Sequence, residues 1–165
     1  MSRRFAISGV PQTETDKTSS SNNNTAVGYN ALSTNTTAEN NTAVGVDALL
    51  TNDASNNTGI GVNALKLSTT GTQNTAVGHN ALTANTTASQ NTAVGQESLK
   101  ANTTGHSNVA VGAEALKANT TASNNTSVGA CSLYSNTTGS TNTAVGCGAL
   151  NANTTASDNT AVGKN

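Results

Sequence analysis

Residues 24–40 read NTAVGYNALSTNTTAEN, and close variants of this 17-residue unit follow one another to residue 165. The opening NTAVG or a near variant begins at Asn24, Asn41, Asn57, Asn74, Asn91, Asn108, Asn125, Asn142 and Asn159. The spacing is 17 residues except for one step of 16, where Asp53-Ala54 replaces the usual Thr-Thr-Ala after Asn52. A deletion there predicts a tolerant loop. Eight complete units and a truncated ninth, from 24 to 165, indicate a repeat protein.

The composition excludes several classes of protein. Leu, Ile, Val and Phe total only 25 of 165 residues, below the roughly 20% at which a conventional globular core becomes hard to build. Charged residues make up 9% and the net charge is −1, which argues against nucleic-acid or anionic-membrane binding. No apolar run approaches the ~18 residues of a membrane span. The stretch Phe5-Ala6-Ile7 is too short for a secretory signal.

Two columns of the repeat never vary. Gly ends every NTAVG string, and Leu follows four residues later in every complete unit. The residue before each Gly is Val, or Ile at position 60. We interpret the Val and Leu columns as the structural core: Val27, Leu32, Val44, Leu49, Ile60, Leu65, Val77, Leu82, Val94, Leu99, Val111, Leu116, Val128, Leu133, Val145 and Leu150. The position after the Gly varies freely, which predicts exposure to solvent.

The pattern of one repeat unit predicts one coil of a solenoid. In NTAVG, Thr and Val share one face of a strand and Ala lies on the other. The Gly indicates a positive φ or a close backbone approach. The next segment is a short second strand or a single helical turn, with Ala and Leu favouring the turn, and Asn-Thr-Thr closes the coil. Stacked coils would form Asn and Thr ladders that satisfy buried amides and hydroxyls.

These features predict an all-β fold, a parallel β-solenoid or β-roll about 40 Å long at ~4.8 Å per coil. Each coil has little apolar surface to set against the entropy of ordering its backbone. Three chains packed around an axis by their small-residue faces would bury more surface and cover edges. We therefore expect an intertwined or side-by-side homotrimer.

The NTAVG columns resemble the head repeats of trimeric autotransporter adhesins, in which three left-handed parallel β-rolls form a rod. The longer unit, NTAVGYNALSTNTT at 24–37 and NTAVGHNALTANTT at 74–87, is more similar to repeats of phage tail fibres and other virion fibres. The resemblance covers residues 24–165. It implies a short virion fibre or decoration on a capsid or tail, located at the virion surface. We see no coiled-coil stalk, membrane anchor, terminal knob or chaperone domain of those families, which disfavours the autotransporter.

Residues 1–23 belong to no repeat. One interpretation is an attachment segment and linker that docks the rod to a capsid or tail protein, through Arg3, Arg4, Phe5, Ile7 and Val10. The alternative is a disordered start or a cap over the first coil, because solenoids need covered ends.

The chemistry of the chain predicts no enzyme, cofactor or metal. His79 and His106 occupy different columns and lack ligand partners at metal-binding spacing. Cys131 and Cys147 fall in neighbouring coils, so either a disulfide or two free thiols is compatible with the sequence. The acidic residues are scattered, so no paired-carboxylate site is expected.

Three further roles stay open. The truncated ninth coil could stack on another molecule and build an extracellular filament or surface adhesin. Thr pairs could order water and bind ice, although adjacent residues in a corner do not share a face; these pairs are Thr36/Thr37, Thr86/Thr87 and Thr103/Thr104. A host glycan or receptor could bind along a variable column, which we take to hold Tyr29, His79, Gln96 and Tyr134.

Overall fold

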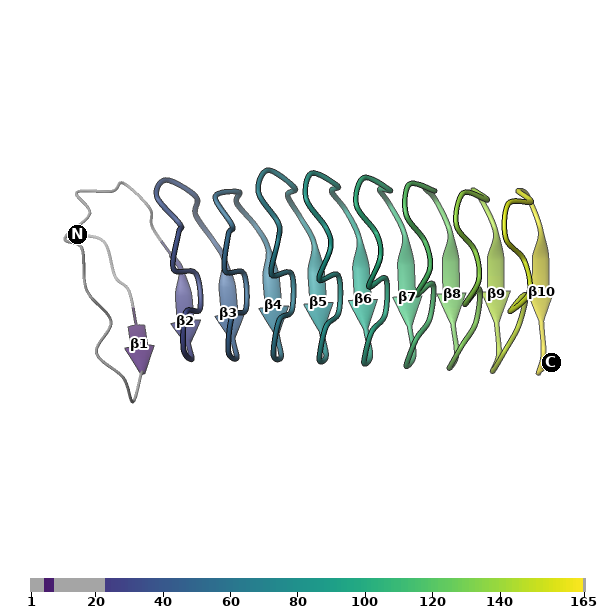
Figure 1. Cartoon of the computed structure of the whole chain (residues 1–165), viewed down its shortest axis with the longest axis horizontal. Coiled ribbons are helices and arrows are strands. Elements are labelled where there is room, and N and C mark those ends of the chain that lie inside the picture. The colour runs from purple at the N-terminus through teal and green to yellow at the C-terminus, as the bar shows by residue number, and fades with distance from the viewer. Residues whose placement is uncertain (1–4, 8–22, 165) are drawn as a thin grey trace.

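The computed structural model describes residues 5–7 and 23–164, and it is a parallel β-solenoid (Figure 1). Each coil contributes one three-residue strand, and neighbouring strands in the sheet are consecutive in the chain. The repeat strands are β2 (Thr25–Val27), β3 (Thr42–Val44), β4 (Thr58–Ile60), β5 (Thr75–Val77), β6 (Thr92–Val94), β7 (Val109–Val111), β8 (Thr126–Val128), β9 (Thr143–Val145) and β10 (Thr160–Val162). The predicted all-β solenoid with 17-residue coils is confirmed.

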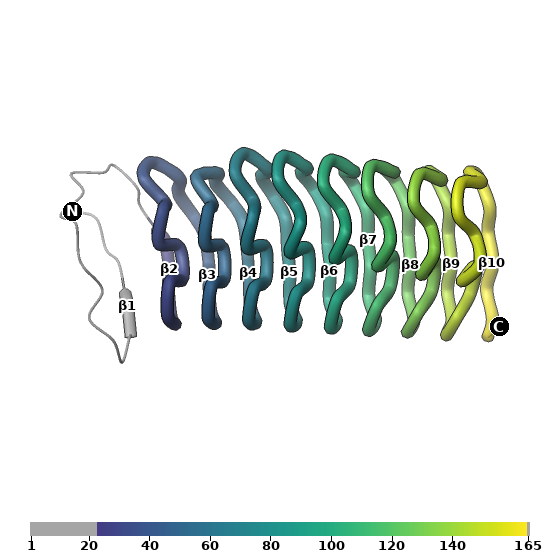
Figure 2. The backbone as a smooth tube through the Cα atoms, in the orientation of Figure 1, coloured from purple at the N-terminus to yellow at the C-terminus, as the bar shows by residue number. Residues whose placement is uncertain are grey.

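The coils stack in single file, so the molecule has a strand side and a loop side along its length (Figure 2). Equivalent residues pair directly: Thr75 lies beside Thr92, and Val77 beside Val94. The short coil keeps this register, because Thr42 still pairs with Thr58. The missing residue is therefore absorbed outside the strands.

A glycine ends each repeat strand because the next coil lies too close for a side chain. The Gly column has φ between 128° and 138°, a region that L-residues rarely enter. A Cβ built on Gly28 would lie 2.5 Å from the carbonyl oxygen of Gly45. The invariance of this column follows from that contact.

The segment after the Gly is neither a second strand nor a helical turn. In the coils described, the Leu column has φ between 48° and 52°, and the residue two before it is also left-handed, as at Asn30 (φ 55°). This backbone turns each Leu into the coil and lets its amide reach the next coil, as in the 3.1 Å bond from Leu32 N to Ala48 O. The expected helical turn is thus replaced by a left-handed turn.

The interior of each coil is built from Leu, Ala and Asn. Leu32, Leu49, Leu65, Leu82, Leu99, Leu116 and Leu133 are fully buried, and Leu150 is partly buried against the same cluster. The central Ala of the strand and the Ala before the Leu join them, as Ala76 and Ala81 do in one coil. The small-residue face of the strand therefore lies inside the coil, and the prediction that this face packs against other chains around a trimer axis is wrong.

The structure corrects the prediction for the Val column. Its members are half-buried or exposed, and they lie on the strand face opposite the buried Ala, outside the coil. The residues concerned are Val27, Val44, Ile60, Val77, Val94, Val111, Val128 and Val145. The physical reason is space: a Cβ built on Gly59, in the alanine position, would lie 3.1 Å from Leu49 Cγ and 3.1 Å from Ala64 O. A branched side chain would not fit there.

Two ladders of asparagine cross-link the coils from within. Asn74 Oδ1 accepts a 3.0 Å hydrogen bond from the backbone amide of Asn91, and Asn74 Nδ2 donates to Ala88 O at 2.8 Å. The second ladder runs through residues such as Asn119, whose Nδ2 donates to Asn102 Oδ1 at 2.9 Å. The predicted stacking of Asn over Asn is confirmed, and it satisfies most of the polar groups that burial would otherwise penalise. Among the described residues, Asn35 Oδ1 and Asn41 Nδ2 are buried without a partner.

Candidate self-association interface

The outer surface of the sheet carries two parallel columns, which we call the Thr–Val face. The first column is Thr25, Thr42, Thr58, Thr75, Thr92, Val109, Thr126, Thr143 and Thr160. The second is Val27, Val44, Ile60, Val77, Val94, Val111, Val128, Val145 and Val162. Both columns point outward because side chains alternate along a strand and the central residue of each strand points inward.

The face is regular in two directions. Neighbouring strands of a sheet lie about 4.8 Å apart, and residues i and i+2 of one strand are about 6.6 Å apart. No strand is shifted, since Thr92 pairs with Val109 and Val94 with Val111 like every other rung. The result is a regular grid of methyl and hydroxyl groups over nine rungs.

The Thr–Val face is uncharged, and its side chains are partly exposed. Every residue of β2 to β10 is Thr, Val, Ile, Ala, Ser or Gly. In the stretch that the structure describes, the hydroxyls of Thr75, Thr92 and Thr126 donate to no protein atom. Val111, Val128 and Val145 are each 37% exposed. A lone chain therefore leaves its strand Val residues partly in water, while the Leu column is buried or, at Leu150, partly buried.

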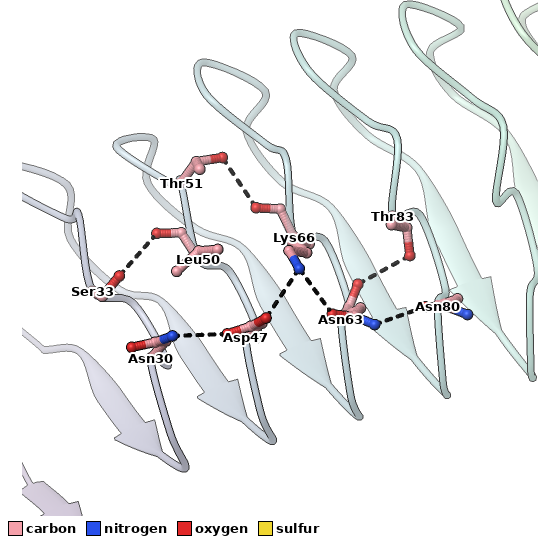
Figure 3. Close-up of polar contacts among 9 residues, drawn as sticks. All are labelled: Asn30, Ser33, Asp47, Leu50, Thr51, Asn63, Lys66, Asn80 and Thr83. Carbon is pink, nitrogen blue, oxygen red and sulfur yellow. Dashed lines mark hydrogen bonds and ion pairs between the residues drawn. The ribbon is translucent and has the colours of Figure 1, made fainter.

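The loop side of the coil is polar by contrast (Figure 3). Asn30 Nδ2 donates to Asp47 Oδ1 at 3.1 Å, and Asn63 Nδ2 donates to Asn80 Oδ1 at 3.1 Å. Lys66 Nζ bridges this row by an ion pair with Asp47 Oδ2 at 3.0 Å. The polar side chains of the loop side thus find their hydrogen-bond and ion-pair partners in neighbouring coils of the same chain.

The charged side chains further along the loop side also pair with one another. Glu97 binds Lys100 at 2.8 Å and Lys117 at 2.7 Å, and Lys117 also binds Glu114 at 2.7 Å. Hydrogen bonds from Lys100 and Lys117 lower the pKa of Glu97 to about 2. The same contacts to Glu114 and Glu97 raise the pKa of Lys117. The cluster is an internally neutralised patch and not a free anion or cation site.

The N-terminal attachment prediction falls mostly outside the described residues. Arg3, Arg4 and Val10 belong to the parts that are not described. Strand β1 (Phe5–Ile7) pairs in parallel with β2, with Phe5 beside Thr25 and Ile7 beside Val27. These two residues therefore take register positions that continue the two columns of the Thr–Val face.

In the described part of the chain, the histidines and cysteines form neither a metal site nor a disulfide. His79 contacts Asn80, and His106 contacts Ser107. Within residues 23–164 no group of three or more potential ligands is gathered that could hold a metal ion. Cys131 and Cys147 are free thiols, and Cys131 Sγ donates to Glu114 Oε2 at 3.7 Å. Burial and the nearby Glu114 carboxylate raise the pKa of the Cys131 thiol.

The variable column holds Tyr29, His79 and Gln96, but Tyr134 lies elsewhere, in the column that follows the Leu. There the centre of its ring lies 5.5 Å from Lys117 Nζ, and Tyr134 lines a shallow groove of about 470 Å³ that runs over four coils. The prediction that Tyr134 belongs to the variable column after the Gly is therefore wrong.

The corner Thr pairs do not form a free hydroxyl array. The first member of each pair is half-buried, and its hydroxyl donates to the next coil, as Thr86 does to Thr103 O at 3.3 Å and Thr103 to Thr120 O at 3.1 Å. Only the second member, such as Thr87, is exposed. The Thr residues that face outward without a hydrogen-bond partner are those of the Thr–Val face, which the repeat pattern did not indicate as a hydroxyl array.

None of the described residues lies in a helix that could cross a membrane. Comparison of the chain with protein-family models, with curated proteins and with solved structures finds no match.

Proposed function

We propose that this chain is a virion structural protein, a short rigid homotrimeric fibre or decoration on a phage capsid or tail. The observation that supports self-association is the Thr–Val face, which runs through nine coils without a charge and leaves its Val column partly exposed. Packing three such faces around an axis would remove these side chains from water, which is favourable in proportion to the area covered. The virion part of the proposal rests on the similarity of the repeat to phage fibre repeats.

In this role the work of the chain is mechanical. Ladders of backbone bonds and buried Asn join each coil to the next, so the rod resists bending. The ion pairs of the loop side are internally neutral and face outward. Residues 1–23 would attach the rod to the particle. Such a fibre would contact a host surface through its loop side.

The native mass tests the self-association. Three chains of 16.3 kDa give about 49 kDa by light scattering. Val77→Asp with Val94→Asp places charges in the middle of the face, and we expect this variant to run as one chain with its β-type circular dichroism retained. The matched control is Thr87→Asp with Thr104→Asp, which charges exposed corner positions and should leave three chains. A wild-type mass of one chain would contradict the trimer.

Particle incorporation tests the attachment. A chain without residues 1–23 should form the same rod and keep its mass, yet fail to enter particles. Normal incorporation of that shortened chain would show that the attachment segment lies elsewhere.

A second candidate function, ice binding, is favoured by the same face. Its unbonded Thr hydroxyls and Val methyls form a grid at regular spacings, a surface able to order water. This function needs the face to be free, so it belongs to a single-chain rod. Inhibition of ice recrystallisation by a 16 kDa species, abolished by Val77→Asp with Val94→Asp, would support it; an assembled protein without such activity would exclude it.

A further inference from the structure

The 16-residue coil interrupts the first of the two asparagine ladders. In most full-length coils the Asn before the strand donates to a corner carbonyl of its own coil, as Asn74 Nδ2 does at 2.8 Å. In the short coil the equivalent carbonyl, Ala54 O, accepts instead from Asn52 Nδ2 at 2.7 Å and from Asn57 Nδ2 at 3.3 Å. Within residues 23–164, Asn41 Nδ2 is therefore a buried donor without an acceptor.

The same corner interrupts the second ladder. In the later coils an Asn of that ladder donates to the Asn one coil before it, as Asn119 Nδ2 does to Asn102 Oδ1. Asn52 occupies this column, but its Nδ2 donates to Ala54 O within its own corner. Asn35 Oδ1, one coil before Asn52, is therefore a buried acceptor without a donor in the part of the chain that the structure describes. The loss of one residue thus leaves one donor and one acceptor unpaired.

The two unpaired atoms belong to side chains that surround Asn24. Asn24 Nδ2 and Asn35 Nδ2 both donate to Ala38 O, at 2.8 and 3.1 Å, and Asn24 Oδ1 accepts the backbone amide of Asn41 at 2.8 Å. Asn35 is 6% exposed and Asn41 is 0% exposed, so bulk solvent does not satisfy them. Reversing either side-chain amide would break a bond, because Asn41 Oδ1 accepts the amide of Asn57 at 2.8 Å and Asn35 Nδ2 is bound to Ala38 O.

We propose that a single water molecule binds inside the short coil, where it donates a hydrogen bond to Asn35 Oδ1 and accepts one from Asn41 Nδ2. Water is the smallest molecule that offers a donor and an acceptor together, and a buried water makes about two to four bonds to polar groups that otherwise have none. Buried polar groups without any partner are rare in folded proteins. The water replaces the bonds that the deletion removed, so it joins the 16-residue coil to its neighbours. The site lies within one chain and does not depend on the proposed self-association.

A high-resolution crystal structure of the full chain locates the water directly. We expect one density peak within hydrogen-bond distance of both Asn35 Oδ1 and Asn41 Nδ2. A direct bond between these two side chains, or no density between them, would overturn the proposal.

Nuclear magnetic resonance tests the same site in solution. A water molecule held inside a protein gives nuclear Overhauser contacts to the protons beside it, and we expect such contacts at the side-chain amide of Asn41. The control within the chain is Asn108, whose Nδ2 already donates to Ala122 O at 2.8 Å and should show none. Water contacts that are equally strong at both side chains, or missing at both, would contradict the proposal.

Lengthening the corner should remove the water. Asp53→Thr with one Thr inserted after Asn52 produces Asn-Thr-Thr-Ala, the sequence of residues 85–88, so both ladders regain a full-length corner. We expect the β-type circular dichroism to persist and the water contact at Asn41 to disappear. The matched control, Asp53→Thr alone, keeps the 16-residue length and should keep the contact. A contact that survives the insertion, or one that is lost in the control, would overturn the assignment of the water to the shortened corner.

Discussion

At the scale of one residue, the Asp53 side chain explains how the 16-residue coil keeps its strand in register with its neighbours. In a full-length corner, Thr86 O accepts the amides of Thr69 and Thr70 at 2.9 and 3.2 Å. In the short coil the equivalent amides bind a side chain instead: Asp53 Oδ1 accepts the amides of Thr36 and Thr37 at 2.9 and 3.0 Å. A carboxylate thus replaces a backbone carbonyl, which leaves the register of the strands unchanged.

This replacement makes one corner sensitive to acid. Partial burial raises the pKa of the Asp53 carboxyl, but the hydrogen bonds from Thr37 and Thr36 outweigh it and hold the pKa below its ordinary 3.8. A lowered folded-state pKa stabilises the fold above that ordinary value, and the stabilisation is lost as the pH falls through the folded pKa. We expect the amide resonances of Thr36 and Thr37 to shift in that acid range.

The control for this titration lies within the same chain. The amides of Thr69 and Thr70 bind a backbone carbonyl, so their resonances should stay in place as the Asp53 corner titrates. Asp53→Ala should remove the acid-range shift at Thr36. Identical titration of both corners would contradict the carboxylate's role.

At the scale of the element, the narrow coil interior decides which residues are core. The strand contributes one Ala, and the left-handed turn contributes Ala and Leu, so these small residues and one Leu fill the section. The Val column is left outside because the alanine position borders the Leu and the backbone of the neighbouring turn. Leu is therefore the main apolar support of each coil.

Truncation of one Leu should be costly. We expect Leu99→Ala, at a fully buried position, to lower the free energy of unfolding by about 2–5 kcal/mol. Gln96→Ala, three residues earlier and exposed, should change it by less than about 0.5 kcal/mol. Urea unfolding followed by circular dichroism measures both. Equal losses of unfolding free energy at the two positions would contradict the assignment of Leu99 to the interior and of Gln96 to the surface.

At the scale of the whole molecule, each coil contacts its immediate neighbours, and the rod is a one-dimensional array. Every repeat strand pairs only with the strands before and after it. Stability in such arrays is close to a sum of coil and interface contributions. The length of the rod is then set by the number of coils.

Removal of one complete coil should therefore leave a folded, shorter rod. Deletion of residues 91–107 joins Gln90 to Asn108, the same Gln-Asn junction as at 90–91. We expect the β-type spectrum to persist and the rod to shorten by about 4.8 Å in small-angle X-ray scattering. Deletion of 91–99 alone breaks the period and should destroy neighbouring coils. Loss of the fold in the 91–107 deletion would contradict the array.

Much of the architecture could be predicted from the repeat alone. The period defined the coil, the Gly column marked the end of the strand, and the Leu and Asn columns marked residues that stack. The assignment of Tyr134 to a variable column was wrong because it ignored the 17-residue register, which places it directly after Leu133. The left-handed backbone of the Leu column was missed because Leu seldom adopts a positive φ.

The sequence by itself determined the period, the order of the strands and their register, because a tandem repeat of nearly equal units permits only one way to stack its coils. Only the tertiary structure decided which face of the strand is interior. Alternation separates Thr and Val from Ala but does not say which side faces in, and hydrophobicity favoured Val. The closed coil leaves room for one methyl group opposite the Leu, so Ala is buried and Val lies on the outer Thr–Val face.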